Sequence, residues 1–192
     1  MAITAGRFQL GPDSGRLLLR TGRQGVGSKV GHDLTIELTD WSAQVDLPGE
    51  SAAGATVTAR FELGSLAVLE GAGGVRPLTD QNRREIEENA RRSLGVNDHP
   101  SATFESREVT PADGGGTISG TLTLHGTPAA IEVRVRELGS DRYCGTAVVT
   151  QSAHGIKPYS AFLGALKLRD EVEIEIQVDL AAAERGRAGR AG

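Results

Sequence analysis

Histidine and cysteine are two of the residue types in this chain that could bind a metal or act as a base or nucleophile. The sequence has four histidines, His32, His99, His125 and His154, and one cysteine, Cys144. None lies in an H-x-x-x-H or C-x-x-C pattern, the spacings that place two metal ligands side by side. His99 and His125 precede Pro and Gly and are typical of turns. We therefore expect no metal site and no cofactor.

A hydrolytic triad is the second chemistry that the residue types allow. Ser152, His154 and Asp170 have the side chains of a nucleophile, a base and an orienting acid. The nucleophile elbow G-x-S-x-G is absent, and a serine two residues before a histidine does not by itself form the required geometry. Cys144 lies among small strand residues without a neighbouring base, which indicates a packed thiol. We expect no catalytic residue, although an enzyme acting on a bound lipid stays as a weak alternative.

Charge and hydropathy exclude several classes of protein. Lys and Arg number 21 against 25 Asp and Glu, a formal charge of −4, which does not favour nucleic-acid binding. No apolar run approaches the ~20 residues of a membrane helix. The first residues lack the pattern of a secretory signal, so the expected location is the cytoplasm. A single cysteine allows no internal disulfide.

The strongest structural pattern lies in residues 116–137, which read GTISGTLTLHGTPAAIEVRVRE. Ile118, Leu122 and Leu124 share one parity, and after the turn Ile131 and Val133 continue the alternation. Successive side chains of a strand point to opposite faces, so the pattern predicts a hairpin with one apolar face. Similar alternation recurs along the chain and predicts about eight strands joined by short links.

Two irregular features interrupt the strands. The alternation of apolar residues shifts from even to odd positions near Thr39 and Asp40, which predicts a turn or a β-bulge there. Residues 81–94 predict one surface helix, with Thr79 or Asp80 as its N-cap. Its apolar stripe is narrow, at Ile86, Ala90 and Leu94, and should cover something beneath it, with the four arginines forming a solvated face. We expect a single domain over 1–180 and a disordered tail over 181–192.

This arrangement favours an antiparallel barrel or sandwich over a βαβ fold. A barrel of about eight strands has room inside for side chains or for one small ligand. Aromatic residues make up 4% of the chain and glycines number 26, so small inward residues could leave a cavity. A core filled by Val, Ile and Leu is the equally weighted alternative.

Two central segments carry a family resemblance. Residues 99–106, HPSATFES, and residues 120–127, GTLTLHGT, resemble motifs of the YceI-like family. His32, residues 64–66 and the closing segment DEVEI at 170–174 fit the same order, and the match covers roughly 30–180. The resemblance implies an all-β fold, an extended lipocalin-like barrel of eight antiparallel strands. It also implies that a long isoprenoid or fatty-amphiphile chain binds inside.

The predicted function is therefore non-catalytic binding, transport or sequestration of a polyisoprenoid or other long-chain lipid. The alternative is a ligand-free barrel associated with stress or with protein interactions, and a homodimer stays open. Strand parity and the resemblance give the following ligand-contacting residues: Leu34, Ile36, Phe61, Phe104, Leu122, Leu124, Ile131, Val133, Ile174 and Ile176. Phe162 and Tyr159 could gate the mouth of the pocket. The polar mouth candidates are His32, His154 and Tyr159.

Overall fold

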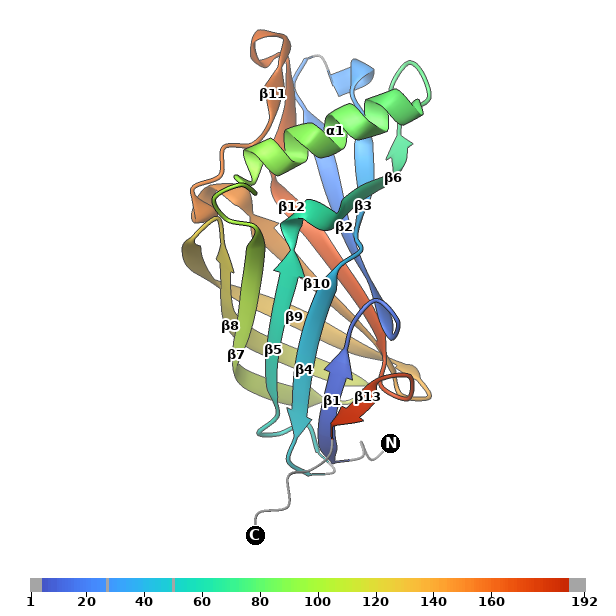
Figure 1. Cartoon of the computed structure of the whole chain (residues 1–192), viewed down its shortest axis with the longest axis vertical. Helices are drawn as coiled ribbons and strands as arrows, with labels where there is room; N and C mark the ends of the chain where they lie inside the picture. Colours follow the sequence, from blue (N-terminus) through green and yellow to red (C-terminus); the bar gives the residue numbers. More distant parts are fainter. Residues whose placement is uncertain (1–4, 27, 50, 187–192) are drawn as a thin grey trace.

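The computed structural model describes residues 5–26, 28–49 and 51–186. This part of the chain forms 13 strands and one α-helix, α1 (Asp80–Ser93) (Figure 1). The strands are β1 (Gly6–Leu10), β2 (Gly15–Gln24), β3 (Asp33–Leu38), β4 (Trp41–Leu47), β5 (Thr56–Glu62), β6 (Leu66–Ala72), β7 (Ser101–Ala112), β8 (Gly115–Leu124), β9 (Thr127–Gly139), β10 (Arg142–Thr150), β11 (Ser160–Ala161), β12 (Leu166–Asp179) and β13 (Glu184–Gly186).

All the strands belong to one antiparallel sheet that curls into a barrel (Figure 1). From β4 the hydrogen-bonded order runs through β5, β7, β8, β9, β10 and β12 to β2 and then β3. Because β3 and β4 are successive parts of one long segment, the sheet returns to the chain segment from which it started. The expected all-β antiparallel barrel with one helix is confirmed.

The expected count of eight strands is wrong, because three long segments each divide into two strands and the short strands β11 and β13 add two more. The breaks lie at residues 11–14, at Thr39 and Asp40, and at the short 3-10 helix Leu63–Ser65. The second break is the irregularity predicted from the shift in alternation. It allows Leu38 and Trp41, which have opposite parity, both to be buried. The Thr39 N–H donates to the Ser65 carbonyl at 3.2 Å, which holds the second and third breaks together.

The hairpin of β8 and β9 has the register that the alternation predicts. Ile118 pairs with Val133, and Gly120 pairs with Ile131. Their shared face is the inner face of the barrel, because these apolar side chains pack in the core cluster around Leu122.

The expected C-terminal tail begins later than residue 181. Residues 184–186 form β13, which pairs with β1 in the register Phe8 to Arg185. Backbone pairing along a free strand edge does not require an apolar period, and for that reason the sequence pattern did not indicate this strand. The rest of the expected tail, 187–192, lies outside the described residues.

Helix α1 begins at a capping box. The Thr79 Oγ1 atom accepts from the Asn82 N–H at 3.2 Å, and the Asn82 Oδ1 atom accepts from the Thr79 N–H at 3.1 Å. The observed bounds, Asp80–Ser93, agree with the predicted helix to within a residue. Satisfying two of the free N–H groups at the start of a helix explains why it starts there.

Helix α1 covers an open edge of the sheet (Figure 1). The pairing of β5 with β7 ends at Glu62, and β6 is hydrogen-bonded on one side, to β3. On the other side, the Glu87 carboxylate accepts from the Val68 N–H at 2.9 Å. Arg83 donates to the Val68 carbonyl at 3.0 Å, and Arg91 donates to the Gly64 carbonyl at 3.0 Å. An uncovered strand edge carries unpaired backbone groups, and here side chains of the helix pair with them.

The prediction that the four arginines of the helix form a solvated face is therefore wrong for Arg83 and Arg91. Both reach back to the carbonyls of the neighbouring strand segment. Arg84 and Arg92 are exposed, as expected.

Candidate ligand-binding site

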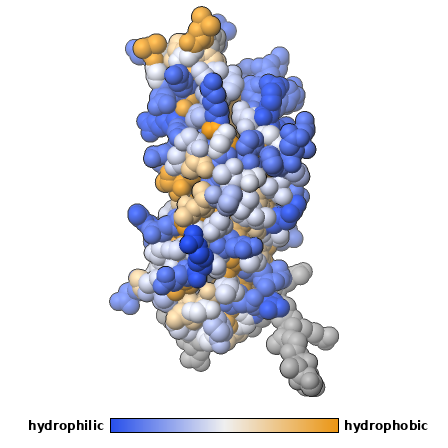
Figure 2. Space-filling view, turned by 90° about the vertical axis from the view of Figure 1, so that its left-hand side faces the viewer, coloured by the Kyte–Doolittle hydropathy of each residue, from blue (hydrophilic) through white to orange (hydrophobic). Residues whose placement is uncertain are grey.

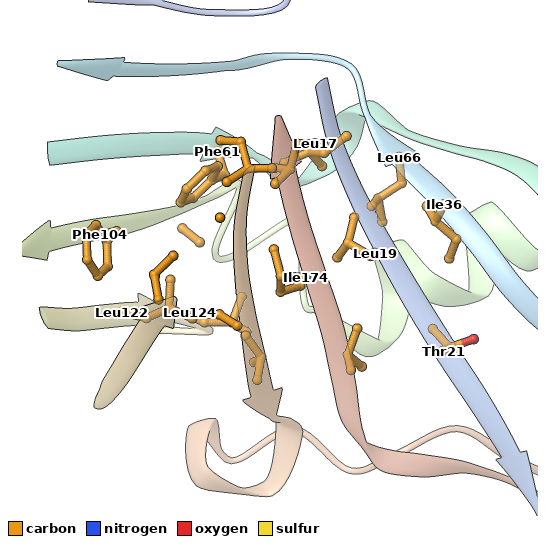
Figure 3. Close-up of a pocket in the computed structure, with 18 of the residues that line it drawn as sticks. Leu17, Leu19, Thr21, Ile36, Phe61, Leu66, Phe104, Leu122, Leu124 and Ile174 are labelled. Atoms are coloured by element: carbon orange, nitrogen blue, oxygen red, sulfur yellow. The ribbon is translucent and has the colours of Figure 1, made fainter. Parts of the chain in front are cut away.

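The barrel encloses a cavity of about 910 Å³. Side chains from the inner faces of the strands and from α1 line it, and Figure 3 shows ten labelled residues around the space. Cavities that bind small molecules span roughly 300–1,000 Å³, so this one is large. Of the two alternatives that the composition left open, the interior with a cavity is the one observed.

Most of the residues expected to contact a ligand line this cavity. They are Leu34, Ile36, Phe61, Phe104, Leu122, Leu124, Ile131, Val133, Ile174 and Ile176. The side chain of Phe162 lies outside the described part of the structure. Contact of these residues with a ligand stays a prediction, but their position on the cavity wall follows from the period-two geometry of the strands.

Small residues on the inner faces explain why the interior is not filled. Ala43, Ala59, Gly145 and Ala147 line the cavity from β4, β5 and β10. Larger side chains at the three alanines would project into the barrel, whereas at Gly145 the space is taken up by Ile176 and Val133. The shortage of aromatic residues in the sequence thus corresponds to free volume inside the fold.

Helix α1 forms part of the cavity wall. Its apolar stripe, Ile86, Ala90 and Leu94, faces the cavity, and polar residues on either side of the stripe reach it as well. The sequence predicted that the stripe covers something, but it did not indicate that the covered feature is the cavity. The i, i+4, i+8 spacing of the apolar residues in the sequence shows which side of the helix is buried, but it does not show what that side packs against.

The polar mouth candidates separate into two groups. His32 and Tyr159 line the cavity, and the His32 Nε2 atom lies 2.8 Å from the Arg76 carbonyl oxygen. His154 is instead buried in the short helix after β10, where its Nδ1 atom lies 2.8 Å from the Thr127 carbonyl. Its placement at the mouth was wrong, because this bond turns the ring against the start of β9.

The three residues considered for a hydrolytic triad do not form one. Asp170 accepts from the Ser152 N–H at 2.8 Å and from the Ser152 hydroxyl, while His154 contacts Thr127. A triad requires the histidine between the acid and the serine. Within the described residues there is also no group of three or more His, Cys, Asp or Glu side chains that could hold a metal.

Few polar groups reach the interior of the cavity. The Thr21 hydroxyl is buried without a hydrogen-bond partner among the described residues, and Figure 3 shows its side chain on the wall beside Leu19. Tyr143 also lines the cavity, and burial raises its pKa, with Glu137 and Asp141 adding to the shift. Such an interior suits a neutral, apolar molecule, because a buried charge without a partner is very unfavourable.

Together, the fold and the cavity define a class of proteins, the β-barrels with an internal apolar cavity. The YceI-like domain profile matches residues 19–180, and the chain belongs to this family. This match confirms the resemblance seen in the sequence. No curated protein matches the chain, and no described helix is long and apolar enough to span a bilayer.

Solved structures of low sequence identity share the fold. BcnA of Burkholderia cenocepacia is 17% identical with a TM-score of 0.62, covering 85% of this chain and 94% of its own. A polyisoprenoid binding domain from Saccharophagus degradans is 14% identical with a TM-score of 0.55, covering 91% and 97%. The YCEI protein of Campylobacter jejuni is 13% identical with a TM-score of 0.56, covering 80% and 85%.

Proposed function

We propose that this protein binds a long-chain apolar ligand, a polyisoprenoid or a fatty amphiphile, inside its barrel and carries or sequesters it without chemical change. The observation that carries the proposal is the cavity of about 910 Å³ with a wall of aliphatic and aromatic side chains. The description of the Saccharophagus degradans neighbour as a polyisoprenoid binding domain supports the same ligand class.

The energetics of burial favour such a ligand. Each buried methylene contributes about 0.8 kcal/mol, so a long hydrocarbon chain can bind tightly with few polar contacts. Conversely, an apolar cavity without a ligand leaves its lining side chains with no contact partners on one side. This second consideration favours a carrier over the alternative, a ligand-free interaction barrel.

The test is mass spectrometry of an organic extract from the purified protein, with two variants on one strand. Ala147 lines the cavity, and the next residue, Val148, is exposed on the outer face of β10. Ala147→Trp places a large side chain inside the cavity, whereas Val148→Trp adds the same side chain outside it. We expect a co-purifying long-chain lipid with the wild type and with Val148→Trp, and a clearly smaller amount with Ala147→Trp.

Two results would contradict the proposal. The first is an extract without lipid, combined with no uptake of an added isoprenoid alcohol. The second is a lipid that persists in Ala147→Trp at the wild-type amount while that variant remains folded by circular dichroism.

A further inference from the structure

One end of the barrel presents large hydrophobic side chains to solvent. Three loops meet there, at residues 24–26 with 28–31, at 72–79 and at 155–168, and we call these described residues the rim loops (Figure 1). Gln24 pairs with Lys167, and Asp33 pairs with Ala72, so the loops flank one another.

The described rim loops hold most of the strongly exposed apolar residues. Val26 is 94% exposed, Val75 is 74% exposed, and Leu163 is fully exposed. The space-filling view shows hydrophobic side chains at the top of the molecule, beyond the polar surface of the barrel wall (Figure 2). Large apolar side chains gathered at one end of a protein mark a surface that meets another apolar phase.

The backbone holds Leu163 in this position. Its φ of 54° and ψ of 32° lie in the left-handed region, which is unfavourable for a residue with a side chain. Strained conformations persist where the surrounding structure imposes them, and they concentrate at functional sites. Neither burial nor internal packing accounts for a leucine presented to solvent by such a backbone.

The charge of the rim loops differs in sign from that of the whole protein. They contain Lys29, Arg76, Lys157 and Lys167 and no acidic residue, whereas the chain has a formal charge of −4. Three acidic residues lie just beyond the loops, at Asp33, Asp80 and Asp170. The Asp33 carboxylate lies 3.7 Å from the Arg23 guanidinium, and the Asp170 carboxylate accepts from the Ser152 N–H at 2.8 Å. Exposed apolar side chains among basic residues match a surface with an apolar interior and anionic head groups.

The rim loops are continuous with the cavity. Val75, Arg76 and Tyr159 belong to these loops and also line the cavity wall. A molecule that leaves the cavity at this end therefore passes between the exposed residues of the rim.

We propose that the rim loops dock this end of the barrel onto an anionic lipid bilayer. Val26, Val75 and Leu163 enter the boundary between head groups and acyl chains, and the basic residues contact the lipid phosphates. An apolar molecule can then move between bilayer and cavity without crossing water. The docking goes beyond the proposed ligand binding, because the surface attaches to a bilayer whether or not the cavity is occupied.

The experiment is co-sedimentation with vesicles of phosphatidylcholine alone or mixed with phosphatidylglycerol. We expect the wild type to bind the mixed vesicles, to bind phosphatidylcholine weakly, and to lose affinity as added salt screens the charges. The combined variant Val26→Ser, Val75→Ser, Leu163→Ser should bind the mixed vesicles at least about tenfold more weakly. Val148→Ser, the same type of change at an exposed position on the barrel wall, should bind like the wild type.

The basic residues are tested separately. Lys29→Gln and Lys167→Gln should each weaken binding about fivefold, whereas Arg107→Gln, on the exposed face of β7, should not. Absence of wild-type binding to mixed vesicles, or unchanged binding by the folded rim variants, would overturn the docking proposal.

The docking and the proposed ligand binding fail independently. A protein that carries lipid but ignores vesicles refutes the docking alone. One that binds vesicles but holds no lipid refutes the carrier function alone.

Discussion

The Arg20 Nη1 atom lies 2.7 Å from the Glu175 Oε2 atom, although the two residues are 155 positions apart in the sequence. The ion pair joins β2 to β12, the contact through which the N-terminal and C-terminal parts of the sheet meet. The hydrogen bond from Arg20 lowers the pKa of Glu175 below its ordinary value of 4.5.

Removing this carboxylate should lower stability in a pH-dependent way. A lowered pKa in the folded state stabilises the fold above the ordinary value, and the contribution is lost as pH falls through the lowered pKa. Because the pair is partly exposed, Glu175→Gln should lower the free energy of unfolding by up to ~1 kcal/mol at neutral pH. The difference from the wild type should shrink below pH 4.5 in urea titrations. Glu171→Gln serves as the exposed control, and a difference that persists in strong acid would contradict the assignment.

The unpaired hydroxyl of Thr21 should make the fold less stable than it could be. Thr21→Val removes a buried polar atom that lacks a partner among the described residues and keeps the shape of the side chain. An unsatisfied buried group costs about 1–3 kcal/mol, so the variant should gain up to that amount in urea denaturation. Thr21→Ser retains the hydroxyl and should show no gain. A loss of stability in Thr21→Val would mean that the hydroxyl has a partner in solution.

Gly120 should tolerate no side chain. A Cβ at this position would lie 2.5 Å from the Glu105 carbonyl oxygen and 2.5 Å from the Phe104 ring. Overpacking of this kind costs about 1–3 kcal/mol, so Gly120→Ala should lower the thermal midpoint by several degrees. Gly49→Ala is the matched control, since no described atom lies within 4 Å of the place its methyl group would take. Equal midpoints for the two variants would contradict the packing at β7 and β8.

Weakening the contact between α1 and β6 should speed the exchange of a ligand between cavity and solvent. Glu87→Leu removes the acceptor of the Val68 N–H and the 3.8 Å ion pair with Arg91. We expect faster hydrogen exchange at Val68 and faster release of a fluorescent fatty acid. Glu88→Leu makes the same change at an exposed position of the helix. If both variants release the probe at the same rate, the contact with β6 does not control access.

Local pattern was enough to predict the inner wall of the barrel. Leu122 and Leu124 on one strand, and Ile131 and Val133 on the next, face the cavity because side chains alternate along any strand. The helix was predicted for a similar reason, since its cap and its stripe are encoded within a few turns of chain.

Features that depend on distant contacts were not predicted. His154 is oriented by a carbonyl 27 residues away, and Arg83 reaches a strand edge that exists after the sheet has curled. Neither contact leaves a periodic trace in the sequence. The free volume in the barrel likewise depends on many inward-facing residues together. For that reason, the composition could not decide between a filled interior and one with a cavity.

The cavity wall is formed partly by the sheet and partly by α1, and these two parts differ in stiffness. Around most of its circumference, neighbouring strands are joined by backbone hydrogen bonds, and widening it there would break a whole ladder. On the α1 side, the wall is held by individual side-chain contacts such as that of Glu87 with the Val68 N–H. If the proposed ligand binding holds, a ligand of greater girth should therefore displace this one side, while the diameter set by the strands stays constant.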